Sequence, residues 1–348
     1  MKAAVWYNNR DIRIEEVPTP SPGTGEMLVK VHSCGICGSD IVEWYRLPRA
    51  PLVQGHEIGV EVVATGTGVN RFKIGDRLFI APKIPCMKCR YCLNGHYPQC
   101  TSAKDRLPGG FAEYILVPGE IVAGGCYPLP ENISYDQATF IEPLACVIRA
   151  QRLAGAEPDQ NMLVLGAGMS GLLHIKLAKY KACTVSATDI RPERRKLAEQ
   201  FGAGHTFSAE ADVANELIRT TGRKADVVVV TTGAPPALEQ AWQSVDMGGA
   251  VVLFAVPGPE KTVTVPVNDF WRKEIRILTS YYCGPDDIET AIGLIKEKKI
   301  TVDELITHRL PLEETVKGFN LLLGGDKSLK VIIKPHQKNK MKDQRLSR

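Results

Sequence analysis

The sequence has no apolar run that approaches the roughly 18 residues needed to cross a bilayer. It also lacks an apolar segment of the signal-peptide type, because Met1 leads directly into an alternating, strand-like pattern. The sequence also lacks a large excess of either positive or negative charge. The net charge is +4 over 348 residues, which gives no case for nucleic acid as a partner. These absences predict a cytoplasmic protein that acts without a membrane and without nucleic acid.

Much of the small basic excess lies in the last residues, which are polar and aperiodic. We therefore expect a disordered basic tail over 337–348. The rest of the chain is long enough for two domains, and its 44% hydrophobic and 24% charged residues are typical of a globular protein. In a reducing compartment, ten cysteines favour metal sites or free thiols over disulfides.

Short alternating runs rich in Val, Gly and Pro fill the first 130 residues or so and predict an irregular β-barrel or sandwich. Within them lies Cys86-x2-Cys89-x2-Cys92-x7-Cys100. Four thiols at this spacing can surround one tetrahedral cation and leave no position open. Such a closed site pins a loop and does no chemistry. A patch of free thiols or an iron–sulfur site is the alternative.

A second candidate site runs from Cys37 to Glu57. It combines the thiol of Cys37, the imidazole of His56 and the carboxylate of Glu57, which are the three residue types that hold zinc. The hydroxyl of Ser39 follows the thiol by two residues, where it could reach the oxygen of a bound substrate. The alternative is a buried cysteine and a core histidine that never meet.

From about Ser134 the apolar period becomes helical. The pattern predicts a linking helix over 134–155, with Ser134 as its N-cap. Pro143 should kink this helix or start a new turn. Glu142, on a mostly apolar segment, then requires a partner. Cys146 follows one helical turn later and could compete with it as a metal ligand.

A dinucleotide fingerprint comes next. The strand Met162–Leu165 leads into the turn from Gly166 to Gly171, then a helix, and a second strand that ends in Asp189. The glycines allow a tight turn, a close approach of the pyrophosphate and close helix packing, and the helix N-terminus offers free N–H groups to phosphates. The residues predicted to bind there are Gly166, Gly168, Met169, Ser170 and Gly171.

The acid at the end of the second strand favours NAD. Asp189 can accept hydrogen bonds from ribose hydroxyls and would repel a 2′-phosphate. The nearby Arg191, Arg194 and Arg195 keep NADP open as the second choice, and Arg194 is counted as a cofactor residue. Further strands alternate with helices, which implies a parallel sheet. Their ends place Thr232, Ala255, Val256 and Pro257 at the cofactor crevice.

Taken together, these motifs resemble the zinc-dependent medium-chain alcohol dehydrogenase family, in its sorbitol and threonine dehydrogenase branch. The resemblance extends from Met1 to about Pro335. It implies a GroES-like β-barrel catalytic domain over 1–133 and a Rossmann domain with a doubly wound parallel sheet over 134–284. A C-terminal segment over 285–336 should return to the first domain.

The resemblance also implies site roles. Cys37, His56 and a carboxylate would hold a catalytic zinc. Glu142 matches the family's acid, and either Glu57 or water completes the shell. The cysteine lobe would hold a second, structural zinc, with Cys86, Cys89, Cys92 and Cys100 as ligands.

Further roles follow from the same resemblance. Asp40 would orient the zinc histidine, and Lys330 would lie near the cofactor phosphates. Ser39, Asp40 and Glu57 are the expected catalytic residues. The substrate pocket is expected to include Trp44, Glu142, Tyr281 and Tyr282.

The chain departs from the family at Val42, where relatives usually carry a relay histidine, so the proton would leave through water or Glu43. The predicted reaction is reversible NAD-linked oxidation of a secondary alcohol to the ketone, the alcohol being a polyol, sugar alcohol, diol or hydroxy amino acid. The rival is a non-catalytic nucleotide-binding scaffold of the same fold. A zinc-free reductase is disfavoured by the cysteine lobe, and a Cys34–Cys37 redox pair by the metal role of Cys37. We expect a homotetramer, with a dimer as the alternative.

Overall fold

A computed structural model describes residues 1–102, 107–325 and 328–337. Apart from Gln337, the tail predicted over 337–348 lies outside these residues. The chain divides into two compact units. The first comprises Met1–Pro143 and the described residues from Gly284 onward, and the second comprises Leu144–Cys283. Among the described residues, every helix is too short or too polar to span a bilayer.

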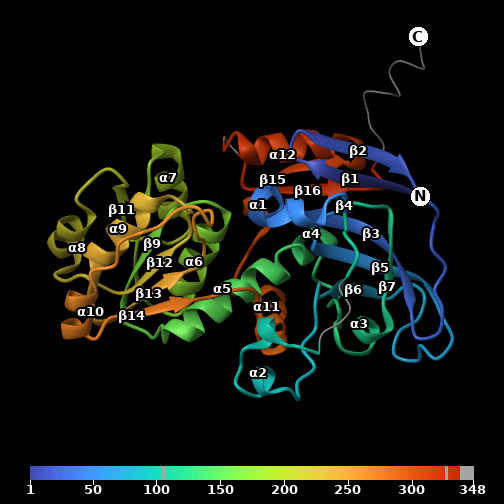
Figure 1. The fold of residues 1–348 in the computed structure, drawn as a ribbon, viewed down its shortest axis with the longest axis horizontal. Coiled ribbons are helices and arrows are strands. Elements are labelled where there is room, and N and C mark those ends of the chain that lie inside the picture. The colour runs from blue at the N-terminus through green and yellow to red at the C-terminus, as the bar shows by residue number, and fades with distance from the viewer. Residues whose placement is uncertain (103–106, 326–327, 338–348) are drawn as a thin grey trace, which may run out of the picture. The chain divides into compact units, whose positions relative to one another are not determined.

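The first unit is built on a mainly antiparallel sheet of seven strands (Figure 1). Its order is β15-β16-β3-β5-β6-β8, with β7 paired to β3. Strands from the end of the chain, drawn red, lie in the same sheet as strands from its beginning. The bounds are β3 (Met27–Gly35), β5 (Glu57–Thr65), β6 (Arg77–Ile80), β7 (Tyr114–Val117), β8 (Cys126–Pro128), β15 (Ile306–Pro311) and β16 (Lys330–Lys334).

A smaller sheet of three strands, ordered β2-β1-β4, belongs to the same unit. Ala4 and Trp6 on β1 and Ile12 on β2 turn toward the core of this unit. That core includes Trp6, Phe111 and Phe319, and the last two rings meet edge to face at 5.9 Å. The smaller strands are β1 (Lys2–Asn8), β2 (Asp11–Glu16) and β4 (Leu52–Val53).

Short helices connect the strands of this unit. They are η1 (Gly38–Ile41), α1 (Glu43–Arg46), η2 (Leu47–Arg49), α2 (Arg90–Leu93), η3 (Tyr97–Gln99), α3 (Gly119–Gly124), α4 (Tyr135–Ala138), α11 (Pro285–Lys296), η4 (Asp303–Leu305), η5 (Leu312–Glu314) and α12 (Thr315–Leu323).

The predicted linking helix is two helices in the structure. Ser134 caps α4 by accepting a hydrogen bond from Gln137 N at 3.1 Å. The helical run then breaks at Thr139 and Phe140, before α5 (Ile141–Ala154) begins. Pro143 therefore does not cause the break. It lies in the first turn of α5, where a missing N–H costs nothing because that N–H has no partner in the helix.

The second unit is a six-stranded parallel sheet in the order β11-β10-β9-β12-β13-β14. In chain order this is 3-2-1-4-5-6, the doubly wound arrangement that binds dinucleotides. Every residue of β9 is buried, because helices cover both faces of such a sheet. The strands are β9 (Asn161–Leu165), β10 (Thr184–Asp189), β11 (His205–Ser208), β12 (Ala225–Val230), β13 (Val245–Leu253) and β14 (Arg276–Thr279).

Its helices after α5 are α6 (Met169–Tyr180), α7 (Pro192–Gln200), α8 (Val213–Thr221), α9 (Pro235–Ser244) and α10 (Val267–Lys273). The fold class predicted from the sequence, an irregular β-barrel joined to a doubly wound parallel sheet, is confirmed.

Candidate metal centres and cofactor turn

Two neighbouring strands bring the first set of candidate ligands together. β3 ends at Gly35, which pairs with Glu57 at the start of β5. Cys37 follows the end of one strand and His56 precedes the start of the other. As a result, ligand atoms of Cys37, His56 and Glu57 all lie within 4.8 Å of one another. The pairing of β3 with β5 thus gathers three residues that lie up to twenty positions apart in the sequence.

A tight 3-10 turn holds the thiol of Cys37. Asp40 Oδ2 accepts a hydrogen bond from Cys37 N at 3.0 Å. The thiol in turn accepts from Ser39 N at 3.4 Å and from Ser39 Oγ at 3.3 Å. These contacts fix the position of the sulfur that would bind a metal.

The carboxylate of Asp40 is fully buried and joins three groups. Its Oδ1 lies 3.5 Å from His56 Nδ1 and 2.8 Å from Arg46 Nη2. Burial raises the pKa of Asp40, but the charge of His56 and then of Arg46 outweighs it and holds the pKa below its usual value. A carboxylate on Nδ1 leaves Nε2 of the ring for a metal, the arrangement in which such an acid orients a ligand histidine.

The imidazole of His56 has a raised pKa, so it favours its protonated form. Burial lowers the pKa of His56, but the charges of Asp40 and Cys37 prevail and leave it well above its usual value. A metal that binds His56 must therefore displace a proton from the ring.

Glu57 has a partner that the sequence analysis did not assign. Lys330 Nζ donates to Glu57 Oε2 at 2.6 Å, and their side chains are 1% and 2% exposed. One carboxylate oxygen of Glu57 remains for a metal. The predicted contact of Lys330 with cofactor phosphates gains no support from this geometry, because the ammonium is buried against an acid of the first unit.

Glu142 does not join this group. It lies in the first turn of α5 and is 5% exposed. Cys146 follows one turn later on the same helix. The assignment of Glu142 as a ligand of the catalytic zinc therefore stays a prediction.

The four cysteines of the lobe converge around α2 and η3. Three of the Sγ–Sγ distances are 3.5 Å for Cys89–Cys92, 4.0 Å for Cys86–Cys92 and 4.0 Å for Cys89–Cys100. Four sulfurs at about 2.3 Å from a tetrahedral zinc lie about 3.8 Å apart. The spacing therefore fits zinc. A backbone hydrogen bond from Lys88 lowers the pKa of Cys86 to about 6, whereas burial raises that of Cys92 to about 12.

The predicted dinucleotide turn forms at the end of β9. Gly166 has a φ of +98°, which favours glycine. A Cβ on Gly171 would lie 1.9 Å from the carbonyl oxygen of Gly166, so only glycine fits there. Gly168 faces open space and is the N-cap of α6, whose first residues are Met169 and Ser170. The backbone is thus open to a ligand on the side where the helix begins.

The acid of the fingerprint is held beside this turn. Asp189 Oδ2 accepts from Ala167 N at 3.0 Å and Oδ1 accepts from Arg191 N at 2.9 Å. Arg194 is only 5% exposed, and burial followed by the charge of Arg191 lowers its pKa. A buried guanidinium is poorly placed for a bulky phosphate, whereas Asp189 lies at the turn itself.

The remaining cofactor residues end two other strands. Thr232 follows β12 and is half-buried, with its Oγ1 accepting from Ala234 N at 3.3 Å. Ala255, Val256 and Pro257 follow β13, and Val256 is 52% exposed. Their contact with nicotinamide stays a prediction.

Two of the residues predicted to line the substrate pocket expose aromatic rings, Trp44 in the first unit and Tyr281 in the second. Trp44 is 47% exposed and Tyr281 is 58% exposed. Tyr282 has a φ of +63°. Trp44 and Tyr281 are thus accessible, and the contact of these three predicted pocket residues with substrate stays a prediction.

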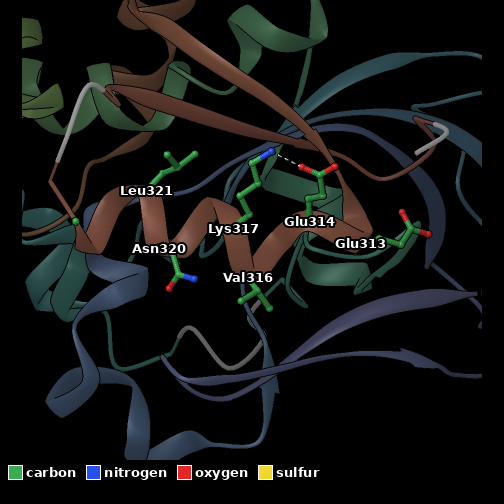
Figure 2. Close-up of a pocket in the computed structure, with 7 residues that line it drawn as sticks. Glu313, Glu314, Val316, Lys317, Asn320 and Leu321 are labelled. Atoms are coloured by element: carbon green, nitrogen blue, oxygen red, sulfur yellow. Dashed lines mark hydrogen bonds and ion pairs between the residues drawn. The ribbon is translucent and has the colours of Figure 1, made fainter. Parts of the chain in front are cut away.

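A surface groove also lies along α12 (Figure 2). Its volume is about 470 Å³, and an ion pair of 2.8 Å between Lys317 and Glu314 crosses its wall. None of the candidate metal ligands described above belongs to its lining, which consists of Glu313, Glu314, Val316, Lys317, Asn320, Leu321 and Gly324. The groove is therefore separate from the site chemistry.

Two site residues were missed from the sequence. Arg46 contacts both Ser39 and Asp40. Thr231, next to the predicted Thr232, donates to the carbonyl of Gly166 at 2.8 Å and so pins the glycine turn. A buried acid such as Asp40 requires a cation, and that requirement was a usable signal for Arg46.

Comparison with known protein families covers most of the chain. Residues 23–131 match the model described as alcohol dehydrogenase GroES-like domain, and residues 171–297 match zinc-binding dehydrogenase. Two curated relatives from Bacillus subtilis are 32% identical to the chain: (R,R)-butanediol dehydrogenase and sorbitol dehydrogenase. The alignments cover 97% of this chain in both cases, with 100% and 98% of the respective relatives.

Solved structures of dehydrogenases also resemble the chain. A protein from Sinorhizobium meliloti bound to NADP has a TM-score of 0.84 at 29% identity, covering 96% of this chain and 99% of its own. A short chain alcohol dehydrogenase from Escherichia coli in complex with NADH has a TM-score of 0.86 at 26% identity, with the same coverages of 96% and 99%.

Proposed function

Because the chain belongs to the zinc-binding medium-chain dehydrogenase family, we propose that it oxidises a secondary alcohol of a polyol or diol reversibly to the ketone, with NAD as its partner. Zinc-dependent NAD(P)-linked oxidation of CH–OH donors is the activity of the family. The secondary alcohol and the preference for NAD are the proposal. Its main support is the convergence of Cys37, His56 and Glu57 beside the hydroxyl of Ser39.

The residues present suit two zinc ions per chain. Cys37 and His56, with Glu57, Glu142 or water, would hold the first, and the four cysteines of the lobe would hold the second. When bound, zinc at the first site would act as a Lewis acid that lowers the pKa of an alcohol, and NAD would be the hydride acceptor.

The protein's own side chains then bind and orient the reacting groups and determine the route of the proton. Ser39 Oγ lies 3.3 Å from Cys37 Sγ, so it is placed to exchange a hydrogen bond with a substrate hydroxyl bound next to that ligand. Asp40 fixes the orientation of His56. Val42 offers no group that accepts a proton, so the proton released in oxidation leaves Ser39 by water.

Two further assignments belong to this proposal. Residues 1–133 with 285–336 form the catalytic domain, and residues 134–284 form the NAD domain. The acid Asp189, held at the glycine turn by two backbone N–H groups, selects NAD over NADP.

The substrate class rests on relatives that act on butanediol and sorbitol. A screen of NAD reduction tests it with 2,3-butanediol, sorbitol, xylitol, myo-inositol, L-threonine and, as a primary alcohol, ethanol. We expect the highest kcat/KM for a diol or polyol, with the ketone as product, and little turnover of ethanol.

Turnover confined to ethanol would refute the secondary-alcohol assignment. Zinc-loaded protein that binds NADH and turns over none of these alcohols would favour the non-catalytic scaffold.

A further inference from the structure

The guanidinium of Arg46 is the group closest to the predicted reacting hydroxyl that the proposed mechanism does not use. Arg46 is the last residue of α1 and its side chain is 11% exposed. Its Nε donates to Ser39 O at 3.0 Å, and its Nη2 donates to Ser39 Oγ and to Asp40 Oδ1, each at 2.8 Å. One planar group thus holds the backbone and the side chain of Ser39 together with the acid that faces His56.

Hydrogen-bond accounting limits what Ser39 can do. A serine hydroxyl has one proton to donate and two lone pairs to accept with. Arg46 occupies one lone pair, and because a guanidinium has no acceptor, the proton of Ser39 must point elsewhere. In this structure it points to Cys37 Sγ, 3.3 Å away. The proton and the second lone pair are thereby directed to the side of the candidate metal ligand.

Other groups near the turn do not provide this orientation. Val42 is apolar. Glu43, which the sequence analysis gave as an alternative route for the proton, accepts a hydrogen bond from Asn9 N at 2.8 Å. Tyr45 lies under the guanidinium at 5.0 Å and supports it from one face. The hydrogen bond that sets the rotamer of Ser39 therefore comes from Arg46.

The charge of Arg46 is largely offset by its ion pair with Asp40. Its contribution to the reaction must then come mainly from geometry. A fork of fixed donors orients its partners, whereas the single rotatable ammonium of lysine does not.

We propose that Arg46 is a positioning residue that holds the Ser39 hydroxyl in the orientation that meets the substrate hydroxyl. This inference rests on the role proposed for Ser39 and deepens it.

A double-mutant cycle tests the inference, using Arg46→Ala, Ser39→Ala and the double variant. The probe is 2,3-butanediol, or the best alcohol of the screen if that is another. Because a small misplacement of a reacting group can cost on the order of 10²-fold, we expect Arg46→Ala to lower kcat by about 10- to 100-fold and to leave KM within a few-fold. In the Ser39→Ala background the same change should cost less than about twofold, since coupled residues are non-additive.

Controls separate this role from a structural one. Zinc content and Tm are measured for each variant. Arg49→Ala is the matched control, because Arg49 stacks on the same Tyr45 ring at 5.0 Å but donates to Tyr45 O and, among the described residues, not to Ser39 or Asp40. It should keep near-full activity. If Arg46→Ala does not fold, Arg46→Lys replaces it in the cycle. It retains the charge, and we expect it to lose kcat as well.

A crystal structure of the Arg46 variant gives a readout independent of turnover. We expect Ser39 to occupy more than one rotamer. Added methylguanidinium should restore part of the activity of Arg46→Ala and none of that of the double variant.

Three results would overturn the inference: no loss of kcat, an equal loss in both backgrounds, or a loss explained by missing zinc. The last two would show that Arg46 acts through Asp40 and His56. If Ser39→Ala alone keeps full activity, the role proposed for Ser39 is wrong. The positioning role proposed for Arg46 is then wrong as well, because it depends on Ser39.

Discussion

At the scale of single residues, Asp40 connects the turn that carries Cys37 to the imidazole of His56. A buried carboxylate that orients a ligand histidine raises the affinity for metal. We predict that Asp40→Asn, which keeps the shape and removes the charge, weakens zinc binding at the first site by about 10- to 100-fold. Zinc retained against a graded chelator series measures this. The matched control is Asp11→Asn, which removes a partly exposed acid that pairs with Arg13.

Unchanged zinc affinity in Asp40→Asn would show that His56 is oriented by something other than this acid. The same assay reports the second zinc as an internal reference, since the cysteine lobe does not contact Asp40.

A second residue-scale prediction concerns Asp189. Its carboxylate lies beside the glycine turn, where it favours ribose hydroxyls and repels a 2′-phosphate. We expect the wild-type protein to show a higher kcat/KM for NAD than for NADP, and Asp189→Ala to narrow the gap by weakening NAD and admitting NADP. Steady-state kinetics with both cofactors measure this. Equal values in the wild type would mean that Arg191 or Arg194 overrides the acid.

The residues that sequence reasoning found lie close together in the sequence, whereas the contacts that it missed depend on the folded structure. Cys37, Ser39 and Asp40 form a local motif, and their spacing in the sequence was enough to place them together at the predicted metal site. The pair Lys330–Glu57 joins residues 273 positions apart, and no local pattern reports such a contact. Arg46 was missed because its partners lie across a turn, where side-chain direction and not periodicity decides the contact.

At the scale of elements, one acid of α4, Asp136, makes hydrogen bonds to three strands of the barrel. Asp136 Oδ1 accepts from Ser33 Oγ on β3 at 2.6 Å and from Lys334 Nζ on β16 at 2.7 Å. Its Oδ2 accepts from Arg309 Nε on β15 at 2.6 Å. Burial raises the pKa of Asp136, but these hydrogen bonds outweigh it and leave the pKa below its usual value.

The depressed pKa sets a pH window. A carboxyl group with a folded-state pKa below the unfolded value stabilises the fold at pH values above the unfolded pKa of about 3.9. That stabilisation is lost as the pH falls through the folded-state pKa. We predict that Asp136→Asn costs about 1.5–3 kcal/mol at pH 7, the usual range for hydrogen bonds to a charged group, and that the difference shrinks below about pH 4.

Urea unfolding of both proteins at several pH values measures this difference. Asp303→Asn is the matched control, because Asp303 is an exposed acid that accepts a hydrogen bond from the neutral amide of Gln137, and its effect should be small. A difference that is constant with pH would mean that the charge of Asp136 is not what stabilises the attachment.

Element boundaries show where sequence reasoning stops. The glycine turn and the strand that precedes it follow from local residue types, and both appear as predicted. The break between α4 and α5 falls at Thr139 and Phe140 and not at Pro143, because packing of α4 on β3 and β5 decides where the helix turns. Proline in a first helical turn is compatible with the helix, so its position alone is ambiguous.

At the scale of the whole molecule, the parallel sheet ends in a strand that pairs on one side only among the described residues. The order of the sheet places β14 at the edge, next to β13. Within β14, Ile277 is 41% exposed. An exposed apolar edge strand is a liability unless another chain pairs with it. We therefore predict association of subunits through this edge, to a homotetramer.

Light scattering at micromolar concentration measures the mass. We expect a tetramer for the wild type and a smaller species for Ile277→Asp, because a charge on the edge opposes pairing. Ile218→Asp is the control. Ile218 is similarly exposed, at 43%, on α8, and its replacement should leave the mass unchanged. A wild-type monomer would refute the prediction.

The central claim is that Cys37 holds a zinc ion that the reaction requires, separate from the zinc of the cysteine lobe. Its most direct test is elemental zinc analysis of wild-type and Cys37→Ala protein, each assayed for NAD reduction. The account predicts two zinc ions per chain in the wild type, and in the variant one zinc, an intact fold and no activity. A Cys37→Ala protein that retains both zinc ions and its activity would contradict it.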